Sequence, residues 1–231
     1  MDAEFAAHLA GKLIEGLKMT LLLLVICGIA GNLLAVPVAL ARVSNNVFLR
    51  VPAYCFILIM RGTPVLVQLY LIYYGLGEVI SQMPGVRSSI FWPYLRSGFW
   101  YAAFALTLNT AGYCGEILRG AITNISNGQI EAAKALGLRR LPIMRLILLP
   151  QAIRAALPAL AGQNVLLLKA TSLASTITVF ELMAAANQVR SETFRVYESL
   201  FGAAIVYVAL TYVLTTVFSL IETRLNRPYR R

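Results

Sequence analysis

Long runs of apolar residues divide the chain into segments of membrane-spanning length. Residues 19–41 form an uncharged run, and residues 199–221 form another near the C-terminus. Because a helix needs about 20 apolar residues to cross a bilayer, both runs are predicted to be transmembrane helices. Three further spans are expected between them, over residues 54–77, 97–122 and 155–178. The pattern predicts an all-α membrane protein with about five transmembrane helices, in one domain over residues 1–231.

Two of the predicted spans contain charged interruptions. Residues 61–64, Arg-Gly-Thr-Pro, interrupt the second, and Lys169 interrupts the fourth. We expect Arg61 near the cytoplasmic end of its span, with Thr63 capping the next helix and Pro64 beginning it. After Lys169, five hydroxyl residues occur within eight positions: Thr171, Ser172, Ser175, Thr176 and Thr178. This density favours a broken or water-lined helix, although hydroxyls bonding to their own helix carbonyls would explain it equally well.

Composition supports a membrane protein and argues against most catalytic centres. Of the 231 residues, 59% are hydrophobic and 13% are charged, and the mean hydropathy is +0.73. A typical soluble domain has about a quarter of its residues charged. The three cysteines, Cys27, Cys55 and Cys114, lie in the apolar runs, and His8 is the single histidine. We therefore expect no disulfide framework, no metal centre, no catalytic residue and no enzymatic activity.

The basic residues are distributed unevenly between the predicted loops. Twelve Lys and Arg residues fall on one side of the five spans, with only Glu131 and Glu222 as acids. The other side has six basic residues mixed with seven acids. Because cytoplasmic loops carry the excess of Lys and Arg, we expect the N-terminus outside and the C-terminus in the cytoplasm. The C-terminal basic group consists of Arg224, Arg227, Arg230 and Arg231.

The loop over residues 126–150 has the signals of a short helix at the cytoplasmic face. Ser126 and Gln129 have the spacing of a capping box at a helix start. Gly137 suits the left-handed residue that ends a helix, and Pro142 suits the first position of the next one. Adjacent Ala132 and Ala133 would leave the helix surface flat for another protein, although an interfacial amphipathic helix without a partner has the same pattern.

Seven positions of this loop together resemble the EAA loop of ABC importer permeases. They are Glu131, Ala132, Ala133, Gly137, Ile147, Leu149 and Pro150. Residues 61–69, 109–120 and 168–173 look like segments of the polar amino-acid and opine branch of the same family. The resemblance covers nearly the whole chain and implies the type I permease fold, with a coupling helix that docks on an ATPase. It assigns that docking to Glu131, Ala132, Ala133, Leu136 and Gly137.

The resemblance also implies a set of partners in a bacterial inner membrane. These are two copies of an ABC ATPase subunit, a second permease that is homologous or identical, and an extracytoplasmic solute-binding protein. ATP and Mg²⁺ would be bound by the ATPase, because this chain has no phosphate-binding G-x-x-x-x-G-K-[ST] loop. We therefore expect no cofactor in this chain, membrane lipid around it, and no nucleic acid.

Ionisable residues inside membrane spans are candidates for the ligand pathway. Glu116 has two interpretations: an ion pair with Arg119 three residues later, or a carboxylate that receives a cationic ligand group, which the resemblance favours. Lys169 would either extend to the outer interface or face a partner such as Glu116 or Glu181. The candidate substrate-binding residues are Glu116, Gln163, Lys169, Thr171 and Ser172.

The expected function is import of a polar amino acid or an amino-acid derivative, such as an opine or a basic amino acid. Related permeases often have an acidic or amide residue where this chain has Ala170. Because alanine offers no contact to a cationic side chain, the resemblance supports a simple cationic amino acid less strongly as the ligand. The alternatives are an importer for another small solute and a component of a secondary carrier. The chain shows no repeated half of the kind that secondary carriers have.

Overall fold

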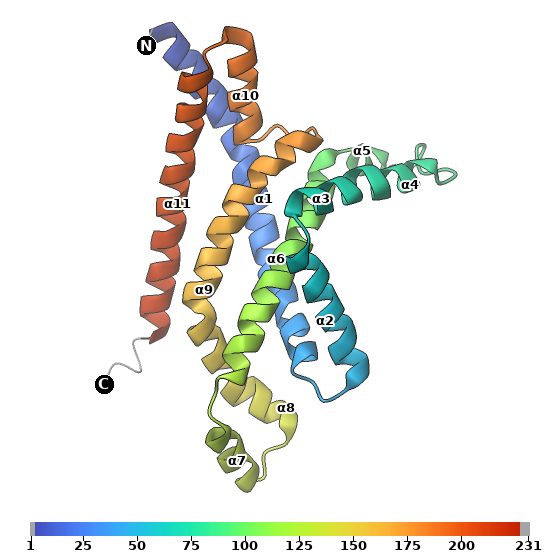
Figure 1. The fold of residues 1–231 in the computed structure, drawn as a ribbon, viewed down its shortest axis with the longest axis vertical. Helices are drawn as coiled ribbons and strands as arrows, with labels where there is room; N and C mark the ends of the chain where they lie inside the picture. The colour runs from blue at the N-terminus through green and yellow to red at the C-terminus, as the bar shows by residue number, and fades with distance from the viewer. Residues whose placement is uncertain (1–2, 227–231) are drawn as a thin grey trace.

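The computed structural model describes residues 3–226, and its regular elements are all helices. Arg227, Arg230 and Arg231 of the expected basic C-terminal group lie outside the described residues. Long helices run side by side along the molecule (Figure 1): α1 (Ala3–Arg42), α6 (Gly98–Thr123), α9 (Leu149–Ala170) and α11 (Val196–Asn226). The start of α1 lies at one end, and the short helix α7 (Asn127–Ala135) lies at the other.

Helix α1 begins 16 residues before the expected span at residue 19. Its 40 residues make a helix of about 60 Å at 1.5 Å per residue, roughly twice the thickness of the hydrocarbon core. The extra turns are stabilised by Phe5, Leu9 and Leu13, which recur every four residues and pack against α10 (Leu182–Thr193). Because this spacing places the three side chains on one helix face, they form a second hydrophobic cluster at the N-terminal end of the molecule.

Helix α6 occupies the centre of the fold, in contact with α1, α2 (Val47–Gly62) and α9. Two glycines of α1 and α6 allow the close approach. A Cβ at Gly31 would lie 2.7 Å from Cβ of Thr110, and a Cβ at Gly115 would lie 2.9 Å from Cγ1 of Val38. Such distances are shorter than real carbon contacts, so α1 and α6 pack at glycine-limited separation, as membrane helices commonly do.

Replacing Gly31 with leucine is expected to lower the free energy of unfolding by at least about 2 kcal/mol, because an overpacked side chain must push α1 away from α6. Thermal unfolding in detergent measures this effect. The matched control is Gly11→Leu, since a Cβ at Gly11 meets nothing within 4 Å. Equal melting temperatures for the two variants would contradict the proposed close packing.

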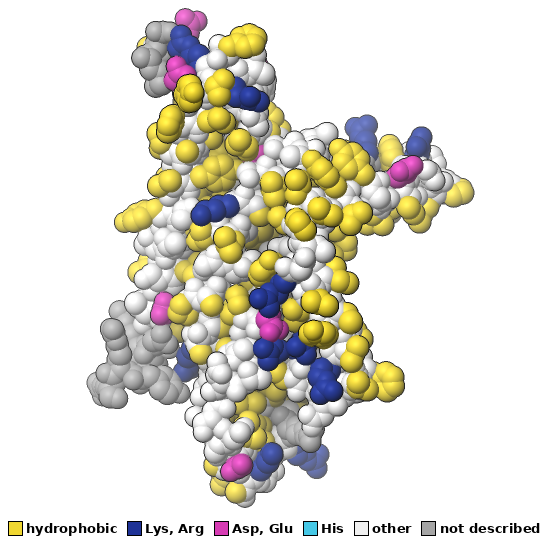
Figure 2. Space-filling model, viewed as in Figure 1, with side chains coloured by type: hydrophobic (Ala, Val, Ile, Leu, Met, Phe, Trp, Pro, Cys, Tyr) yellow, Lys and Arg dark blue, Asp and Glu magenta, His cyan; other side chains and the backbone are white. Residues whose placement is uncertain are grey.

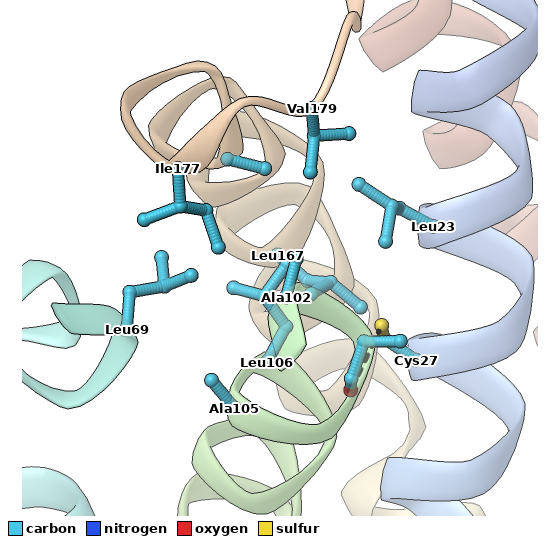
Figure 3. Close-up of a cluster of buried hydrophobic side chains, with 11 residues drawn as sticks. Leu23, Cys27, Leu69, Ala102, Ala105, Leu106, Leu167, Ile177 and Val179 are labelled. Carbon is cyan, nitrogen blue, oxygen red and sulfur yellow. Dashed lines mark hydrogen bonds between the residues drawn. The ribbon is translucent and has the colours of Figure 1, made fainter. Parts of the chain in front are cut away.

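The main hydrophobic core lies where α1, α6 and α9 meet the start of the α3 arm (Figure 3). Leu23 and Cys27 point into it from α1, Leu106 comes from α6, Leu167 from α9, and Leu69 from α3 (Val65–Tyr70). The Cys27 thiol donates to the Ala103 carbonyl over 3.4 Å. This core joins segments from most of the chain, so it fixes the position of α3 relative to the long helices.

The chain bends by 108° between α2 and the following helices. Pro64 has no backbone N–H and cannot continue the hydrogen-bond ladder of α2. Beyond the bend, α3 continues through a π-helical turn at Leu71–Leu76 into α4 (Gly77–Gln82), and α5 (Trp92–Leu95) follows before the chain returns to α6. Figure 1 shows this arm projecting sideways from the body. The expected role of Thr63 was wrong: Thr63 ends α2, with its hydroxyl donating to the Ile59 carbonyl over 2.7 Å.

Three described helices are long and apolar enough to cross a membrane, or four if the bent pair is counted as one span. They are α1, the continuous run over Ile143–Ile177, and α11. Helix α6, with 26 residues, is long enough for a span but is not among these apolar helices, and it packs against α1, α2 and α9. Five spans remain a prediction.

The helix of the fourth predicted span changes form at the hydroxyl-rich segment. The π-helical turn η2 (Ile143–Leu148) precedes α9, and a 3₁₀ segment, η3 (Thr171–Ile177), follows it. Both sequence explanations contribute, because four hydroxyls donate to carbonyls three residues earlier, at 2.7 Å each: Thr171, Ser172, Ser175 and Thr176. The backbone then reverses at Thr178, which has a φ of 69°.

Candidate functional site

The break between α2 and α3 is held by two amide side chains, the buried Gln68 and the half-buried Asn109. Gln68 donates from Nε2 to the Met60 carbonyl over 3.0 Å and to the Thr63 hydroxyl over 2.8 Å. Asn109 of α6 donates from Nδ2 to the same Met60 carbonyl over 3.1 Å and to Oε1 of Gln68 over 3.0 Å. A broken helix leaves carbonyls without partners, and a membrane interior offers no water to satisfy them. The two amides therefore stabilise an irregular backbone that would otherwise be costly.

A cavity of about 390 Å³, called here the upper cavity, opens beside this break. Its walls come from three distant parts of the chain: residues 61–65, the α6 face with Asn109 and Tyr113, and α9 with Gln163, Leu166, Leu167 and Ala170. Gln163 is only 7% exposed, and its amide makes no hydrogen bond to any described residue. Its amide atoms are not among the buried unpaired ones, so they remain open to a ligand in the cavity, and the upper cavity has the features of a polar ligand site.

Arg61 lies in the last turn of α2 and on the wall of the upper cavity. Its guanidinium carbon lies 5.5 Å from the ring centroid of Tyr113, a cation–π contact. The Tyr113 hydroxyl donates to the Arg61 carbonyl over 3.5 Å. No carboxylate side chain lines the upper cavity, so Arg61 gives it a positive charge.

A second cavity of about 310 Å³, the lower cavity, shares Arg61, Gly62 and Tyr113 with the first. Its other walls include Arg42 at the end of α1, Tyr54 of α2, and Glu116 of α6. Figure 2 shows charged side chains gathered in the middle of this face, with hydrophobic side chains around them. The two cavities therefore adjoin along α2 and α6, with the Arg61–Tyr113 contact between them.

Glu116 is already engaged by a neighbour on its own helix. Arg119 donates to its two carboxylate oxygens, from Nη2 over 2.8 Å and from Nε over 2.9 Å. This bidentate contact is the ion pair that the three-residue spacing predicted. Glu116 also lines the lower cavity, so the geometry combines both interpretations of this residue: its carboxylate faces the cavity while its charge is balanced by Arg119.

The remaining candidate residues are distributed differently. Gln163 faces the upper cavity. Lys169 is exposed, lines neither cavity, and has no ion-pair partner among the described residues. Thr171 is fully buried and bonded to its own helix, and Ser172 is likewise bonded to the Lys169 carbonyl. Of the five candidates, the structure thus brings Glu116 and Gln163 to cavity walls.

Sequence reasoning did not assign Asn109, Tyr113, Arg42 and Tyr54 to a site. A signal existed for part of this set, because Asn109, Tyr113 and Glu116 recur at the four- and three-residue spacing of one helix face. No local pattern links α6 to the end of α1 or to residues 61–65, so the rest of the set required the folded arrangement.

Helix α7 projects at the end of the molecule and presents one side outward. Leu136 is 83% exposed, and Glu131 and Ala132 are exposed as well. Ala133 faces the opposite way, buried against Ile143 and Leu148. The expectation of a flat outer surface made by both alanines was therefore wrong for Ala133, because that side chain anchors α7 to the base of the α9 run.

The end of α7 has the left-handed geometry that the sequence predicted. Gly137 has a φ of 78°, its N–H bonds to the Lys134 carbonyl over 2.9 Å, and the Leu138 N–H bonds to the Ala133 carbonyl over 3.1 Å. This pair of bonds is a Schellman motif.

The start of α7 and the next helix differ from expectation. Ser126 occupies the N-cap position but makes no side-chain capping bond, so the predicted capping box was wrong. Gln129 instead accepts a hydrogen bond from Gln151 of α9 over 2.8 Å. Pro142 is the third residue of α8 (Arg140–Pro142) rather than the first.

These features define an integral membrane transport subunit: long apolar helices, adjoining cavities with a few polar and charged groups at a helix break, and a projecting helix anchored to the base of the α9 run. Residues 31–231 match the model of one family, described as the binding-protein-dependent transport system inner membrane component. The chain belongs to this family. It is therefore a multi-pass inner-membrane permease subunit of a binding-protein-dependent transporter, and the family is one of transport components rather than enzymes.

Curated relatives are similar over nearly their whole length. The chain is 45% identical over 210 residues to the octopine transport system permease protein OccM of Rhizobium meliloti, covering 91% of this chain and 84% of that protein. It is 41% identical to the nopaline transport system permease protein NocM of Agrobacterium fabrum, covering 100% and 94%. It is 39% identical to the histidine/lysine/arginine/ornithine transport system permease protein HisM of Salmonella typhimurium, covering 93% and 90%.

Solved structures have the same fold. A chain in the crystal structure of an amino acid ABC transporter with histidines superposes with a TM-score of 0.82 and 32% identity, covering 97% of this chain and 99% of that one. A chain of the inward-facing MetNI methionine ABC transporter superposes with a TM-score of 0.78 over the same shares at 20% identity, which is a likeness of fold. The type I importer permease fold expected from the sequence is thus confirmed.

Proposed function

We propose that this chain is the permease of an ATP-driven importer that carries a polar amino acid or an opine-type derivative into the cytoplasm. The ligand would cross through the upper and lower cavities. Arg61 and the free Gln163 amide would contact it in the upper cavity, and Glu116 would stand at the lower one. The similarity to octopine, nopaline and basic amino acid permeases supports this substrate class.

The observation that carries the proposal is the mechanical connection between α7 and the cavity. Ala133 packs α7 onto Ile143 and Leu148, which belong to the continuous helical run that leads into α9. Further along α9, Gln163 and Ala170 line the upper cavity. Because packed helices move as rigid bodies, a force applied to the exposed side of α7 would be transmitted to the wall that holds the ligand.

The proposed assembly has two ATPase subunits, a second permease that is homologous or identical, and a solute-binding protein. ATP and Mg²⁺ would bind to the ATPases. The orientation would place the start of α1 outside and both α7 and the end of α11 in the cytoplasm. The excess of Lys and Arg in the α6–α9 loop supports this orientation, and α7 lies at the end of the molecule opposite the start of α1 (Figure 1).

Replacing Gly137 with valine tests the coupling role. A Cβ there meets nothing within 4 Å, so the added side chain causes no clash. The penalty is that valine must adopt a positive φ, which costs about 1–2 kcal/mol. We expect the permease to insert and co-purify with the ATPase, while ATP-driven uptake in proteoliposomes falls at least about fivefold because the end of α7 is misplaced. Gly137→Asn, which tolerates this backbone conformation, is the control. Wild-type uptake by the valine variant would argue against coupling through α7.

The alternative that the sequence left open, a component of a secondary carrier, disagrees with membership of a binding-protein-dependent transport family. It would import its ligand without an ATPase, driven by an ion gradient. Purification of the complex distinguishes the two: the importer requires an ATPase in the purified complex and ATP for uptake, whereas a carrier would remain active when reconstituted alone.

A further inference from the structure

The lower cavity holds more positive than negative charge. Arg42 and Arg61 both line it, and among the described residues of its wall Glu116 is the one acid. The Glu116 carboxylate is already satisfied by the bidentate contact from Arg119. Both cavity arginines act on Glu116 through space but neither forms an ion pair with it within the described residues. The charges of Arg42 and Arg61 are therefore available to an anion.

Arg42 lines this cavity, and one of its N–H donors has no protein partner within the described residues. Its Nε atom is buried and has no hydrogen-bond partner in the described part of the chain. The guanidinium carbon lies 4.9 Å from the ring centroid of Tyr54, which holds the planar group in one orientation. A guanidinium presents its N–H donors as a fixed fork that matches a carboxylate or a phosphate. Because Nε itself is shielded, an anion in the cavity would meet the other atoms of the Arg42 guanidinium.

Arg61 connects this cavity with the upper one. It belongs to both walls, as does Tyr113, and its long flexible side chain can follow an anion from one cavity to the other. In the upper cavity, Arg61 and the unpartnered Gln163 amide offer N–H donors to the same kind of group. The two cavities thus adjoin and both offer N–H donors to anionic groups.

We propose that the lower cavity is an anion-binding station, in which Arg42 and Arg61 receive the second carboxylate of a cargo that carries two. This inference rests on the proposed importer function and narrows its substrate class. A cargo with a second carboxylate, such as an N-carboxyalkyl amino acid, would be favoured over an amino acid with only a cationic side chain. A cationic side chain would meet Arg42, Arg61 and a glutamate that Arg119 already neutralises.

A phosphate group of an anionic lipid has the same chemistry as a cargo carboxylate and is the competing source of the anion. Arg42 is the last residue of α1, where a helix end can reach the interface. The lipid would occupy the lower cavity permanently, so its effect would depend on membrane composition and not on the cargo. The experiment therefore varies the lipid composition of the membrane and the cargo.

The test uses the complete transporter in proteoliposomes, made once with phosphatidylcholine alone and once with added phosphatidylglycerol. The probes are radiolabelled octopine, which is arginine with an added N-carboxyethyl group, and arginine itself. We expect the wild type to prefer octopine, and Arg42→Gln to lower octopine uptake about tenfold, the effect of losing one charge-assisted contact. Arginine uptake should change little, in both lipid mixtures. Arg50→Gln, in the exposed first turn of α2, is the matched control and should transport both probes normally.

Arg42→Lys keeps the proposal testable if the glutamine variant does not assemble. Lysine retains the charge and loses the planar fork. Octopine uptake should therefore fall by less than in Arg42→Gln, and the ratio of octopine uptake to arginine uptake should decrease from the wild-type value. An unchanged preference in both Arg42 variants would overturn the inference and leave the importer function intact. An effect that appears only with phosphatidylglycerol would assign the cavity to lipid and also overturn it. A wild-type transporter that imports neither probe would overturn the proposed substrate class itself.

Discussion

Replacing Leu136 with glutamate is expected to reduce ATP-driven uptake at least about thirtyfold. The side chain is 83% exposed, so the permease loses no internal packing, and the predicted effect is on the ATPase contact alone. A buried apolar anchor at a protein interface is commonly worth 2 kcal/mol or more, and a charge in that position adds a desolvation cost. The measurement is uptake in proteoliposomes together with recovery of the ATPase on the purified permease.

Leu136→Met is the control for this prediction, because it keeps an apolar side chain of similar volume. It should assemble and transport like the wild type. If the glutamate variant binds the ATPase and imports at the wild-type rate, Leu136 is not part of the docking surface. The exposed leucine would then be an interfacial residue that contacts lipid, which is the alternative that the sequence left open.

Replacing Gln163 with leucine is expected to impair transport without destabilising the protein. The Gln163 amide has no partner among the described residues and faces the upper cavity, so an apolar replacement removes no internal hydrogen bond. A ligand that uses this amide would lose about 1–2 kcal/mol of interaction. The ligand concentration that gives half-maximal uptake should therefore rise roughly fivefold to thirtyfold.

The neighbouring Asn164 provides the matched control, with the opposite expected result. Its Oδ1 accepts from Nδ2 of Asn32 over 3.2 Å, and its Nδ2 donates to the Leu160 carbonyl over 2.8 Å. Asn164→Leu should therefore lower the melting temperature in detergent, because it leaves the Asn32 amide short of a partner. If Gln163→Leu lowered stability and left half-saturation unchanged, the upper cavity would not be a ligand site.

Local sequence signals predicted the elements whose causes are local. The left-handed Gly137 ended α7 as expected because only the chain adjacent to it decides its backbone conformation. The interruption at residues 61–64 likewise marked a helix break, since Pro64 removes a donor wherever it stands. The Glu116–Arg119 pair was predictable from spacing on one helix.

Features that depend on distant contacts were not predictable in the same way. The inward direction of Ala133 is set by Ile143 and Leu148, which lie outside α7. The extension of α1 back to Ala3 depends on packing against α10. The face on which Lys169 lies depends on the orientation of α9 about its own axis, which packing against neighbouring helices sets. A single charge in an apolar run does not indicate that orientation. The two cavities combine three segments far apart in sequence, so only the fold brings Arg61 and Gln163 to one wall.

Photo-crosslinking from position 136 tests the central claim most directly. A benzophenone amino acid at Leu136 in the assembled transporter should crosslink to the ATPase subunit while cells accumulate ligand, and the yield should change when ATP hydrolysis is blocked. The same amino acid at Ile14, which is exposed in the N-terminal part of α1, the helix whose start lies at the end opposite α7 (Figure 1), should give no ATPase adduct. Adducts from position 136 to lipid alone, during active uptake, would contradict the account that the ATPase drives this permease through α7.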